Sequence, residues 1–381
     1  MTTSRRPSSQ AAAPAGSRPL RAAVLGTGSW GTTFAVVLAD AGCEVRLWGR
    51  SAAVCRQITD DHRNEAYLPG VDLPETITAG TDPAAALEGV DLVAVAVPSQ
   101  EARRTLESMR DLLPPTAVAV SLMKGVELST DRRMSEVVAE AFAIPADRVA
   151  VVSGPNLARE IAERQPTATV IASTSEQTAQ LVARACASAY FRPYTNSDVV
   201  GVELCGAVKN VIALAVGISQ GRGLGFNTMA TVITRGLVEI TRLGLALGAD
   251  AETFPGLAGM GDLVATCASP MSRNHTLGLH IGQGLTLAEA TAATGGTAEG
   301  VKSSRSVLEL ARSIGVEMPI TEAVVAVLHE GLAVDQLAAL LLARPHKAEG
   351  VQPVVGGRHR RPGRRSPDDA ETGAAGRGPA T

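Results

Sequence analysis

Lys209 is the residue of this sequence whose type and surroundings most need a chemical explanation. It lies near the middle of residues 201–218, a proline-free and almost wholly apolar stretch that predicts a buried helix. A lysine left dry and unpaired in such a helix costs several kcal/mol. The side chain could simply reach water from the edge of the helix, or it could serve as a proton donor in a site that the helix borders.

Three further polar motifs interrupt the apolar second half of the chain. They are Gly259-Met260-Gly261-Asp262-Leu263, Ser272-Arg273-Asn274 and Thr297-Ala298-Glu299-Gly300. Each has an ordinary interpretation as a turn or a helix cap. Arg273, however, comes shortly after a proline at an expected helix start, and its guanidinium has the geometry for bidentate binding of a phosphate.

A glycine-rich turn near the N-terminus predicts a second kind of chemistry. Residues 22–25 are a short apolar run, GTGSWG follows at residues 26–31, and a helical pattern continues through residue 41. This is the strand, turn and helix of a dinucleotide-binding unit. The alternative is a glycine turn that binds no ligand, and a second strand at residues 44–48 favours the dinucleotide-binding unit. Gly26 allows the tight turn, Gly28 admits the pyrophosphate, and Gly31 lets helix and strand pack closely. The free N–H groups at Ser29 and Trp30 would point at the phosphates.

The end of the second strand lacks the carboxylate that an NAD-preferring site usually offers to the adenine ribose. The chain has Gly49 and Arg50 there, and the nearest acids, Asp60 and Asp61, lie a helix away. Arg50 could bind the 2′-phosphate of NADP or stack on the adenine, or it could be an ordinary surface arginine. We expect NADP(H) to be accepted at least as well as NAD(H).

The pattern of the whole chain predicts an α/β fold in two parts. Apolar runs at residues 91–97, 117–121 and 148–152 predict parallel strands, each followed by small or charged residues on the same edge of the sheet, and 169–172 and 190–194 are two more strand candidates around a helix at 177–187. Helical patterns then cover residues 199–218, 228–247, 298–314 and 321–342. We therefore expect a dinucleotide-binding domain at 20–196, a helical substrate and catalytic domain at 197–344, and disordered tails at 1–19 and 345–381.

Composition excludes several other classes of protein. A formal charge of −3 over 381 residues gives no electrostatic case for binding nucleic acid. The five cysteines are scattered and never in CxxC spacing, which argues against a disulfide framework or a zinc site; we expect no metal and a cytoplasmic location. No secretory signal is expected, and the best candidate for a membrane span, residues 201–218, is interrupted by Glu203, Lys209 and Asn210.

Taken together, these motifs closely resemble the NAD(P)-dependent glycerol-3-phosphate dehydrogenases of the bacterial type. The resemblance covers residues 21–344, and the matching stretches, in order, are LGTGSWGT, LWGR, NEAYLPG, VPS, MKG, SGPN, GAVKN, ITRG, GMGDL, TC, SRN and MPIT. It implies a Rossmann-type N-terminal domain with a mostly parallel sheet and an all-α C-terminal domain, with the active site between them. The implied reaction is the reversible reduction of dihydroxyacetone phosphate to sn-glycerol 3-phosphate, which feeds phospholipid synthesis. Relatives are often homodimers.

The resemblance also implies a role for each matching position. The family's catalytic lysine corresponds to Lys209. Its substrate-binding positions correspond to Lys124, Gly154, Asn156, Lys209, Asp262, Ser272, Arg273 and Asn274. Its cofactor positions correspond to Ser29, Trp30, Arg50, Lys124, Ala158, Arg273, Thr297 and Glu299, in addition to the glycines of the turn. Asn156 stands where threonine is common in relatives, and Thr297-Ala298 replaces a more branched apolar pair.

Elementary chemistry agrees with a lysine in the catalytic role. When a hydride reduces a ketone, negative charge develops on the carbonyl oxygen, and an ammonium can stabilise that charge and donate the proton. Burial would lower the pKa of Lys209, whereas a nearby Asp262 would raise it. Two alternatives are a related two-domain hydroxy-acid or sugar-acid dehydrogenase, which would need a carboxylate pocket, and an NAD(P)-binding protein without catalytic activity.

Overall fold

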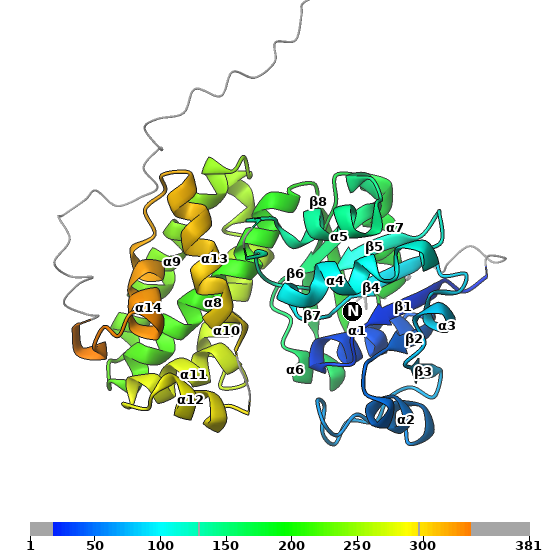
Figure 1. Cartoon of the computed structure of the whole chain (residues 1–381), viewed down its shortest axis with the longest axis horizontal. Helices are drawn as coiled ribbons and strands as arrows, with labels where there is room; N and C mark the ends of the chain where they lie inside the picture. The colour runs from blue at the N-terminus through cyan, green and yellow to red at the C-terminus, as the bar shows by residue number, and fades with distance from the viewer. Residues whose placement is uncertain (1–17, 129, 296–297, 337–381) are drawn as a thin grey trace, which may run out of the picture.

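The structure is a computed structural model that describes residues 18–128, 130–295 and 298–336. The chain forms two adjoining parts, an α/β part from its first half and a helical part from its second (Figure 1). The expected tails at 1–19 and 345–381 lie, apart from residues 18 and 19, outside the described residues, and so does Thr297.

The α/β part is built on one sheet of eight strands. The order of the strands is β3-β2-β1-β4-β5-β6-β7-β8, and neighbours are parallel except for the antiparallel pair β6–β7. The bounds are β1 Arg21–Leu25, β2 Glu44–Trp48, β3 Ile77–Gly80, β4 Leu92–Val95, β5 Val118–Ser121, β6 Val149–Ser153, β7 Thr167–Ala172 and β8 Phe191–Asn196. The predicted α/β fold with a mostly parallel sheet is confirmed.

Helices cover both faces of this sheet, which is why its central strands are apolar on both sides. On β4, Leu92 and Ala94 pack in one core with α1, α6 and α7, while Val93 and Val95 pack in another with α3, α4 and α5. The bounds of these helices, with α2, are α1 Ser29–Asp40, α2 Ala52–Asp60, α3 Pro83–Leu87, α4 Ala102–Glu107, α5 Met134–Phe142, α6 Ala158–Ala162 and α7 Glu176–Cys186. Short 3-10 turns precede some elements, among them η1 at Ser99–Glu101.

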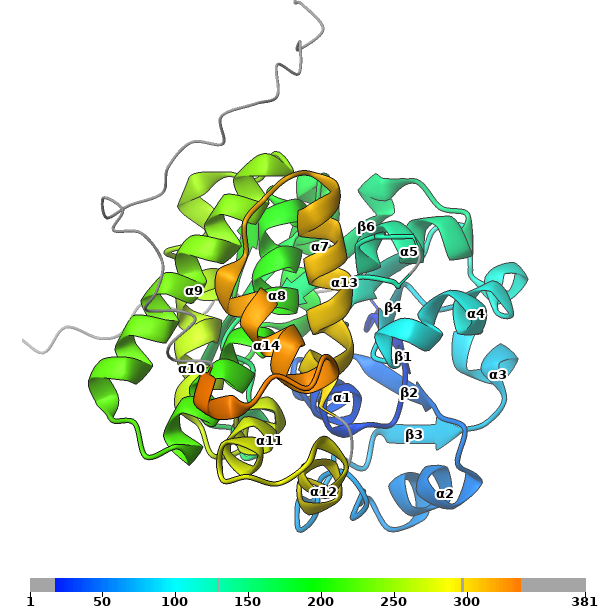
Figure 2. The ribbon, with the colours of Figure 1, turned by 60° about the vertical axis from the view of Figure 1, so that its left-hand side comes forward.

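The helical part is arranged around α8, Val199–Gly221, which carries Lys209 (Figure 2). Asp198 caps its first turn by accepting the amide of Gly201 at 2.9 Å. Helices α9, α10, α11, α13 and α14 all contact α8. The bounds of the helices beyond α8 are α9 Phe226–Ala246, α10 Asp262–Ala268, α11 Arg273–Gly282, α12 Leu287–Ala293, α13 Glu299–Ser313 and α14 Pro319–His329.

The apolar composition of α8 is that of a core helix. It is the one helix among the described residues that is long and apolar enough to cross a membrane, with a mean hydropathy of 1.9 over its most apolar window, yet 89% of that window is buried inside the protein. Its apolar side chains are therefore accounted for by packing against other helices.

The structure corrects two details of the sequence-based prediction. Strand β3 was not expected, because only Ile77 of its four residues is buried and it lies at the edge of the sheet. The last predicted helix, 321–342, is interrupted: α14 ends at His329, Gly331 follows in the left-handed region at φ +75°, and residues 334–336 are helical again. Residues 337–342 of that prediction lie outside the described residues.

Glycines bring α8 and α11 unusually close together. A Cβ atom added to Gly278 would lie 2.3 Å from the carbonyl oxygen of Leu214, and one added to Gly217 would lie 2.1 Å from that of His275. No side chain fits at such distances without moving a backbone. The α8–α11 contact therefore depends on these glycines.

We predict that Gly278→Ala lowers the free energy of unfolding by about 1–3 kcal/mol or more, because the added methyl group must push two helix backbones apart. Urea denaturation followed by circular dichroism would measure the loss. Gly80→Ala is the matched control, since a Cβ there meets nothing within 4 Å, and it should change the stability by less than about 1 kcal/mol. Equal effects of the two substitutions would contradict the packing argument.

Candidate active site

The glycine turn between β1 and α1 is folded as its sequence predicts. Gly26 has φ +123°, and a Cβ there would lie 2.6 Å from the carbonyl oxygen of Ala96, so the tight turn needs glycine. A Cβ on Gly31 would lie 2.1 Å from the carbonyl oxygen of Gly26, which explains the close packing of helix on turn. A Cβ on Gly28, by contrast, would meet nothing within 4 Å. Gly28 therefore faces open space at the N-terminus of α1.

A cavity of about 820 Å³ opens in front of this turn. It brings together most of the predicted cofactor residues: Gly26, Gly28, Ser29, Trp30, Gly31, Arg50, Ala158, Arg273 and Glu299 all line it. The last two come from the helical part, so the cavity lies between the two parts of the chain. Lys124, which was also predicted to contact the cofactor, is not among its lining residues.

The cavity has the features that a nicotinamide dinucleotide requires. Side-chain-free space at Gly28 would admit the pyrophosphate to the free N–H groups at the start of α1. The indole Nε1 of Trp30 is buried without a hydrogen-bond partner among the described residues, so a donor is available at the same turn. The volume lies within the range of small-molecule sites. These residues fit NAD(H) or NADP(H).

Three ionisable side chains meet at the contact between the two parts of the chain. Lys209 of α8 forms an ion pair with Asp262, the first residue of α10, and its Nζ donates to Thr266 Oγ1 at 2.7 Å. Lys124, which follows β5, donates to the other carboxylate oxygen of Asp262 at 2.9 Å. The side chains of Lys209 and Asp262 are only 7% and 2% exposed. One buried carboxylate thus holds two ammonium groups.

This arrangement separates the proton affinities of the two lysines. Burial and the repulsion of Lys124 outweigh the attraction of Asp262 and lower the pKa of Lys209 to about 7. Burial also lowers the pKa of Lys124, but the attraction of Asp262 together with the hydrogen bonds to Lys209 and Asp262 outweighs it and leaves that pKa above its ordinary value. Burial would raise the pKa of Asp262, yet the two lysines hold it below its ordinary value. Near neutral pH, Lys209 is therefore the member of the trio that can gain or lose a proton.

Backbone geometry aims Asp262 at the lysines. The five preceding residues, Leu257–Gly261, form a π-helical turn. The turn is so tight that a Cβ on Gly259 would lie 2.0 Å from the carbonyl oxygen of Phe254, which explains the glycine at that position. Asp262 then starts α10, which continues directly from this turn.

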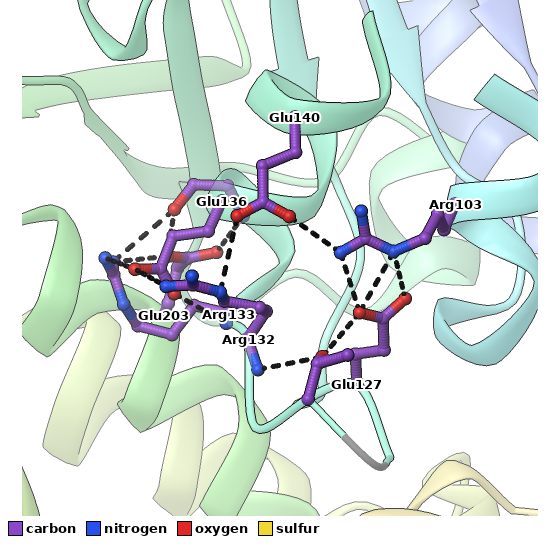
Figure 3. Close-up of polar contacts among 9 residues, drawn as sticks. Arg103, Glu127, Arg132, Arg133, Glu136, Glu140 and Glu203 are labelled. Carbon is purple, nitrogen blue, oxygen red and sulfur yellow. Dashed lines mark hydrogen bonds and ion pairs between the residues drawn. The ribbon is translucent and has the colours of Figure 1, made fainter. Parts of the chain in front are cut away.

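Ion pairs hold the segment after Lys124 against α8 (Figure 3). Arg103 on α4 donates to Glu127 in the loop between β5 and α5 at 2.8 Å. At the end of this loop Arg133 donates to Glu203 of α8 at 2.8 Å. The segment that begins at Lys124 and the helix that carries Lys209 are therefore linked to each other at a second point.

Of the remaining predicted substrate residues, Arg273 lines the dinucleotide cavity, whereas Gly154, Asn156, Ser272 and Asn274 are not among its lining residues. Gly154 has φ +147° and lies between β6 and α6. Asn156 donates to Thr169 Oγ1 at 3.0 Å, while its own carbonyl oxygen is buried without a partner among the described residues. Ser272 caps α11, and Asn274 accepts the amide of Gly300 at 2.9 Å. Asn274 thus has a structural contact at the start of α13 in addition to its predicted role.

Glu299 connects the cavity with the lysines electrostatically. It is exposed where it lines the cavity. Desolvation raises the pKa of its carboxyl, and the positive charges of Lys124, Arg273 and Lys209, in that order, partly offset the rise. Glu299 is thus within electrostatic reach of both the cavity and the lysines.

Some residues of the site carried no signal that identified them in the sequence. Thr266, which accepts a hydrogen bond from Lys209, lies in the stretch TC, which was noted as a family match without a role. Asn64 donates to the carbonyl oxygen of Thr27 and to Thr32 Oγ1, both at 2.8 Å, and so braces the glycine turn. Tyr67 lines the cavity and accepts at its carbonyl oxygen the Ser29 hydroxyl at 2.6 Å. The stretch NEAYLPG, which contains Asn64 and Tyr67, was noted as a family motif without a role.

A Rossmann-type sheet with a cavity that fits a dinucleotide, joined to a helical part that contributes a buried lysine, is typical of an NAD(P)-dependent dehydrogenase. Comparisons with known proteins agree and are more specific. The family model for the NAD-dependent glycerol-3-phosphate dehydrogenase N-terminus matches residues 21–179, and the model for the C-terminus of the same family matches residues 198–339. This chain belongs to the NAD-dependent glycerol-3-phosphate dehydrogenase family.

Individual relatives support the same assignment. An NAD(P)+ glycerol-3-phosphate dehydrogenase of Streptomyces griseus is 60% identical over 331 residues, which are 87% of this chain and 98% of that protein. One from Corynebacterium jeikeium is 57% identical over 87% of this chain and 100% of its own length. The crystal structure of a glycerol-3-phosphate dehydrogenase from Coxiella burnetii is 41% identical, with a TM-score of 0.82 over 86% of this chain and 99% of that one. The chain is an NAD(P)-dependent oxidoreductase.

We predict that Asp262→Asn lowers the free energy of unfolding by about 3–5 kcal/mol at pH 7, because it leaves two buried ammonium groups without their counter-ion. The pKa values of both lysines then fall below those of the unfolded chain, which binds more protons, so the stability of the variant should rise with pH. Urea denaturation of variant and parent between pH 7 and pH 9.5 would measure the difference, which should shrink over this range.

The matched control is Asp72→Asn, which removes an exposed partner of Arg63 with a side chain 81% exposed. It should change the stability by less than about 1 kcal/mol. A loss for Asp262→Asn that does not depend on pH would show that the buried lysines are not its cause.

Proposed function

We propose that this chain catalyses the NAD(P)H-dependent reversible reduction of dihydroxyacetone phosphate to sn-glycerol 3-phosphate, with Lys209 as the general acid and base. The observation that carries the proposal is the buried Lys209, which shares Asp262 with Lys124 beside the dinucleotide cavity. Its pKa of about 7 suits a group that donates a proton in one direction and accepts it in the other.

In the proposed mechanism the chain supplies charge and protons. The bound nicotinamide supplies the hydride for reduction and accepts it in the reverse reaction. The ammonium groups of Lys209 and Lys124 stabilise the negative charge that develops on the substrate carbonyl oxygen, and Lys209 donates its proton to that oxygen. Asp262 holds both lysines in place, and Thr266 fixes the direction of the Lys209 amine. In the reverse direction the neutral amine of Lys209 removes the hydroxyl proton.

The phosphate of the substrate needs cationic and amide partners at a fixed distance from the carbonyl. Arg273 is exposed at the start of α11, where the guanidinium and the N-terminus of the helix both favour an anion. We assign Ser272, Arg273 and Asn274 to this phosphate, and Gly154 and Asn156 to the rest of the substrate. The buried, unpartnered carbonyl oxygen of Asn156 supports a polar ligand there.

The proposed cofactor contacts follow the cavity lining, with Arg50 at the adenosine end and Glu299 at the end formed by the helical part.

We propose that residues 20–196 form the cofactor-binding domain and 197–344 the catalytic domain; β8 ends at Asn196 and α8 begins at Val199. A cytoplasmic location and a role in supplying phospholipid synthesis are part of the proposal. All five cysteines are free, as a reducing compartment requires. A homodimer is proposed from the family alone, and sedimentation velocity would test it.

We predict that the purified protein oxidises NADH and NADPH only when dihydroxyacetone phosphate is present, measured by absorbance at the nicotinamide band. Lys209→Ala should cut kcat by about 10²- to 10⁴-fold, the typical contribution of general acid–base catalysis, while the Kd of the cofactor stays nearly unchanged. If the kcat of Lys209→Ala equals that of the parent, the proposed acid–base role is excluded. Turnover with 2-keto acids but not with dihydroxyacetone phosphate would instead favour a hydroxy-acid dehydrogenase.

The pKa of Lys209 gives a second prediction. Reduction needs the ammonium form, so kcat/KM for reduction should fall above about pH 7, whereas oxidation of glycerol 3-phosphate needs the amine and should rise with pH up to a plateau above the same pH. Asp262→Asn removes the attraction that raises the pKa of Lys209. The fall of kcat/KM for reduction and its rise for oxidation should therefore both occur at lower pH. Profiles that are flat between pH 6 and pH 8.5 would contradict the assignment.

A further inference from the structure

The adenosine end of the cavity has an unusual distribution of charge. A Rossmann site usually places a carboxylate at the end of its second strand for the ribose hydroxyls. Here β2 is followed by Arg50, and the one acid among the residues that line the cavity is Glu299, which comes from the helical part. Nothing in the local sequence after β2 supplies the acid.

The structure brings a carboxylate to this place from another strand. Arg50 Nη1 lies 2.7 Å from Glu101 Oε2, and Glu101 follows β4, on the far side of β1 from β2. The residues between β4 and Glu101 include Val97 and Pro98, which line the cavity. The Arg50–Glu101 ion pair therefore spans the carboxyl ends of β2 and β4, the strands on either side of the glycine turn.

The backbone that carries Glu101 is firmly held. Its amide donates to the carbonyl oxygen of Pro98 at 2.9 Å, and its own carbonyl accepts the Thr105 hydroxyl at 2.9 Å. The neighbouring Gln100 donates to the carbonyl oxygen of Val126 at 2.9 Å and accepts the amide of Leu128 at 3.0 Å. The backbone of Glu101 is thus fixed by the fold, while its side chain is 38% exposed.

We infer that Glu101 is a specificity-determining residue that lowers the preference of this enzyme for NADP(H) relative to NAD(H) by holding the guanidinium of Arg50. The inference rests on the proposed role of Arg50 in binding the adenosine end of the cofactor. A 2′-phosphate can bind the guanidinium of Arg50 only in competition with the carboxylate of Glu101. The neutral 2′-hydroxyl of NAD(H) does not compete for Arg50 and leaves the ion pair intact.

Four forms of the full-length protein test this: the parent, Glu101→Gln, Arg50→Ala and the double variant. The Kd values of NADPH and NADH would be measured by quenching of tryptophan fluorescence, because the two tryptophans of the chain, Trp30 and Trp48, both line the cavity. Steady-state kcat/KM values with both cofactors give an independent ratio. Glu107→Gln is the matched control, since it removes a negative charge from α4 and leaves the Arg50–Glu101 pair in place.

We expect Glu101→Gln to raise the affinity for NADPH relative to NADH by about threefold to tenfold, the size of effect of a half-exposed ion pair, and to do so less at high salt. In the Arg50→Ala background the same substitution should have little effect on this ratio. Glu107→Gln should leave the ratio unchanged.

These measurements distinguish a failure of the inference about Glu101 from a failure of its premise, the role of Arg50 in binding the cofactor. If Arg50→Ala lowers the preference for NADPH while Glu101→Gln leaves it unchanged, Arg50 binds the phosphate and the inference about Glu101 is wrong. If the effect of Glu101→Gln persists in full without Arg50, the carboxylate does not act through Arg50, and the inference is again overturned. If Arg50→Ala leaves the ratio unchanged, the proposed role of Arg50 itself fails.

Discussion

The site depends on one buried carboxylate placed between two ammonium groups. Asp262 comes from α10, Lys209 from α8 and Lys124 from the end of β5, so the sheet and the helical part meet in a single electrostatic contact. The trio has two basic groups and one acidic group, so the carboxylate cannot stabilise both ammonium ions equally. Lys209 is the less stabilised of the two, and its pKa is lowered to about 7. The lowered pKa of Lys209 and the contact between the two parts of the chain thus have the same physical cause.

Packing supports this contact at short range. Gly206 lets α8 approach Ser153 and Lys124, since a Cβ there would lie 2.9 Å from the Ser153 hydroxyl. A Cβ on Gly300, at the start of α13, would lie 2.8 Å from the carbonyl oxygen of Asn210. Small residues thus let α8 approach the sheet on one side and α13 on the other. These close approaches bury the helix that carries Lys209.

Much of this architecture could be predicted from the sequence, because its signals are local. The glycine turn, strand β2 and the start of α8 follow from periodicity and residue type, and the charge of Lys209 in an apolar helix pointed to Asp262 as a partner. Contacts between distant segments left no such signal. Thr266, Asn64 and Glu101 are ordinary residues until the fold places them beside Lys209, the glycine turn and Arg50. Strand β3 and the end of α14 were missed or misplaced because edge strands and helix ends depend on tertiary contacts.

The burial of α8 also has a consequence for how the protein is made. The helices that contact it, α9, α10, α11, α13 and α14, all follow it in the chain, and α13 ends roughly 90 residues after α8 does. At ordinary rates of translation the ribosome needs about 5 to 20 seconds for that length. During this interval the nascent chain presents a helix with the length and hydropathy of a membrane segment, without the helices that later cover it. Lys209 and Glu203 then have a further effect, since ionisable side chains within an apolar stretch oppose its insertion into lipid.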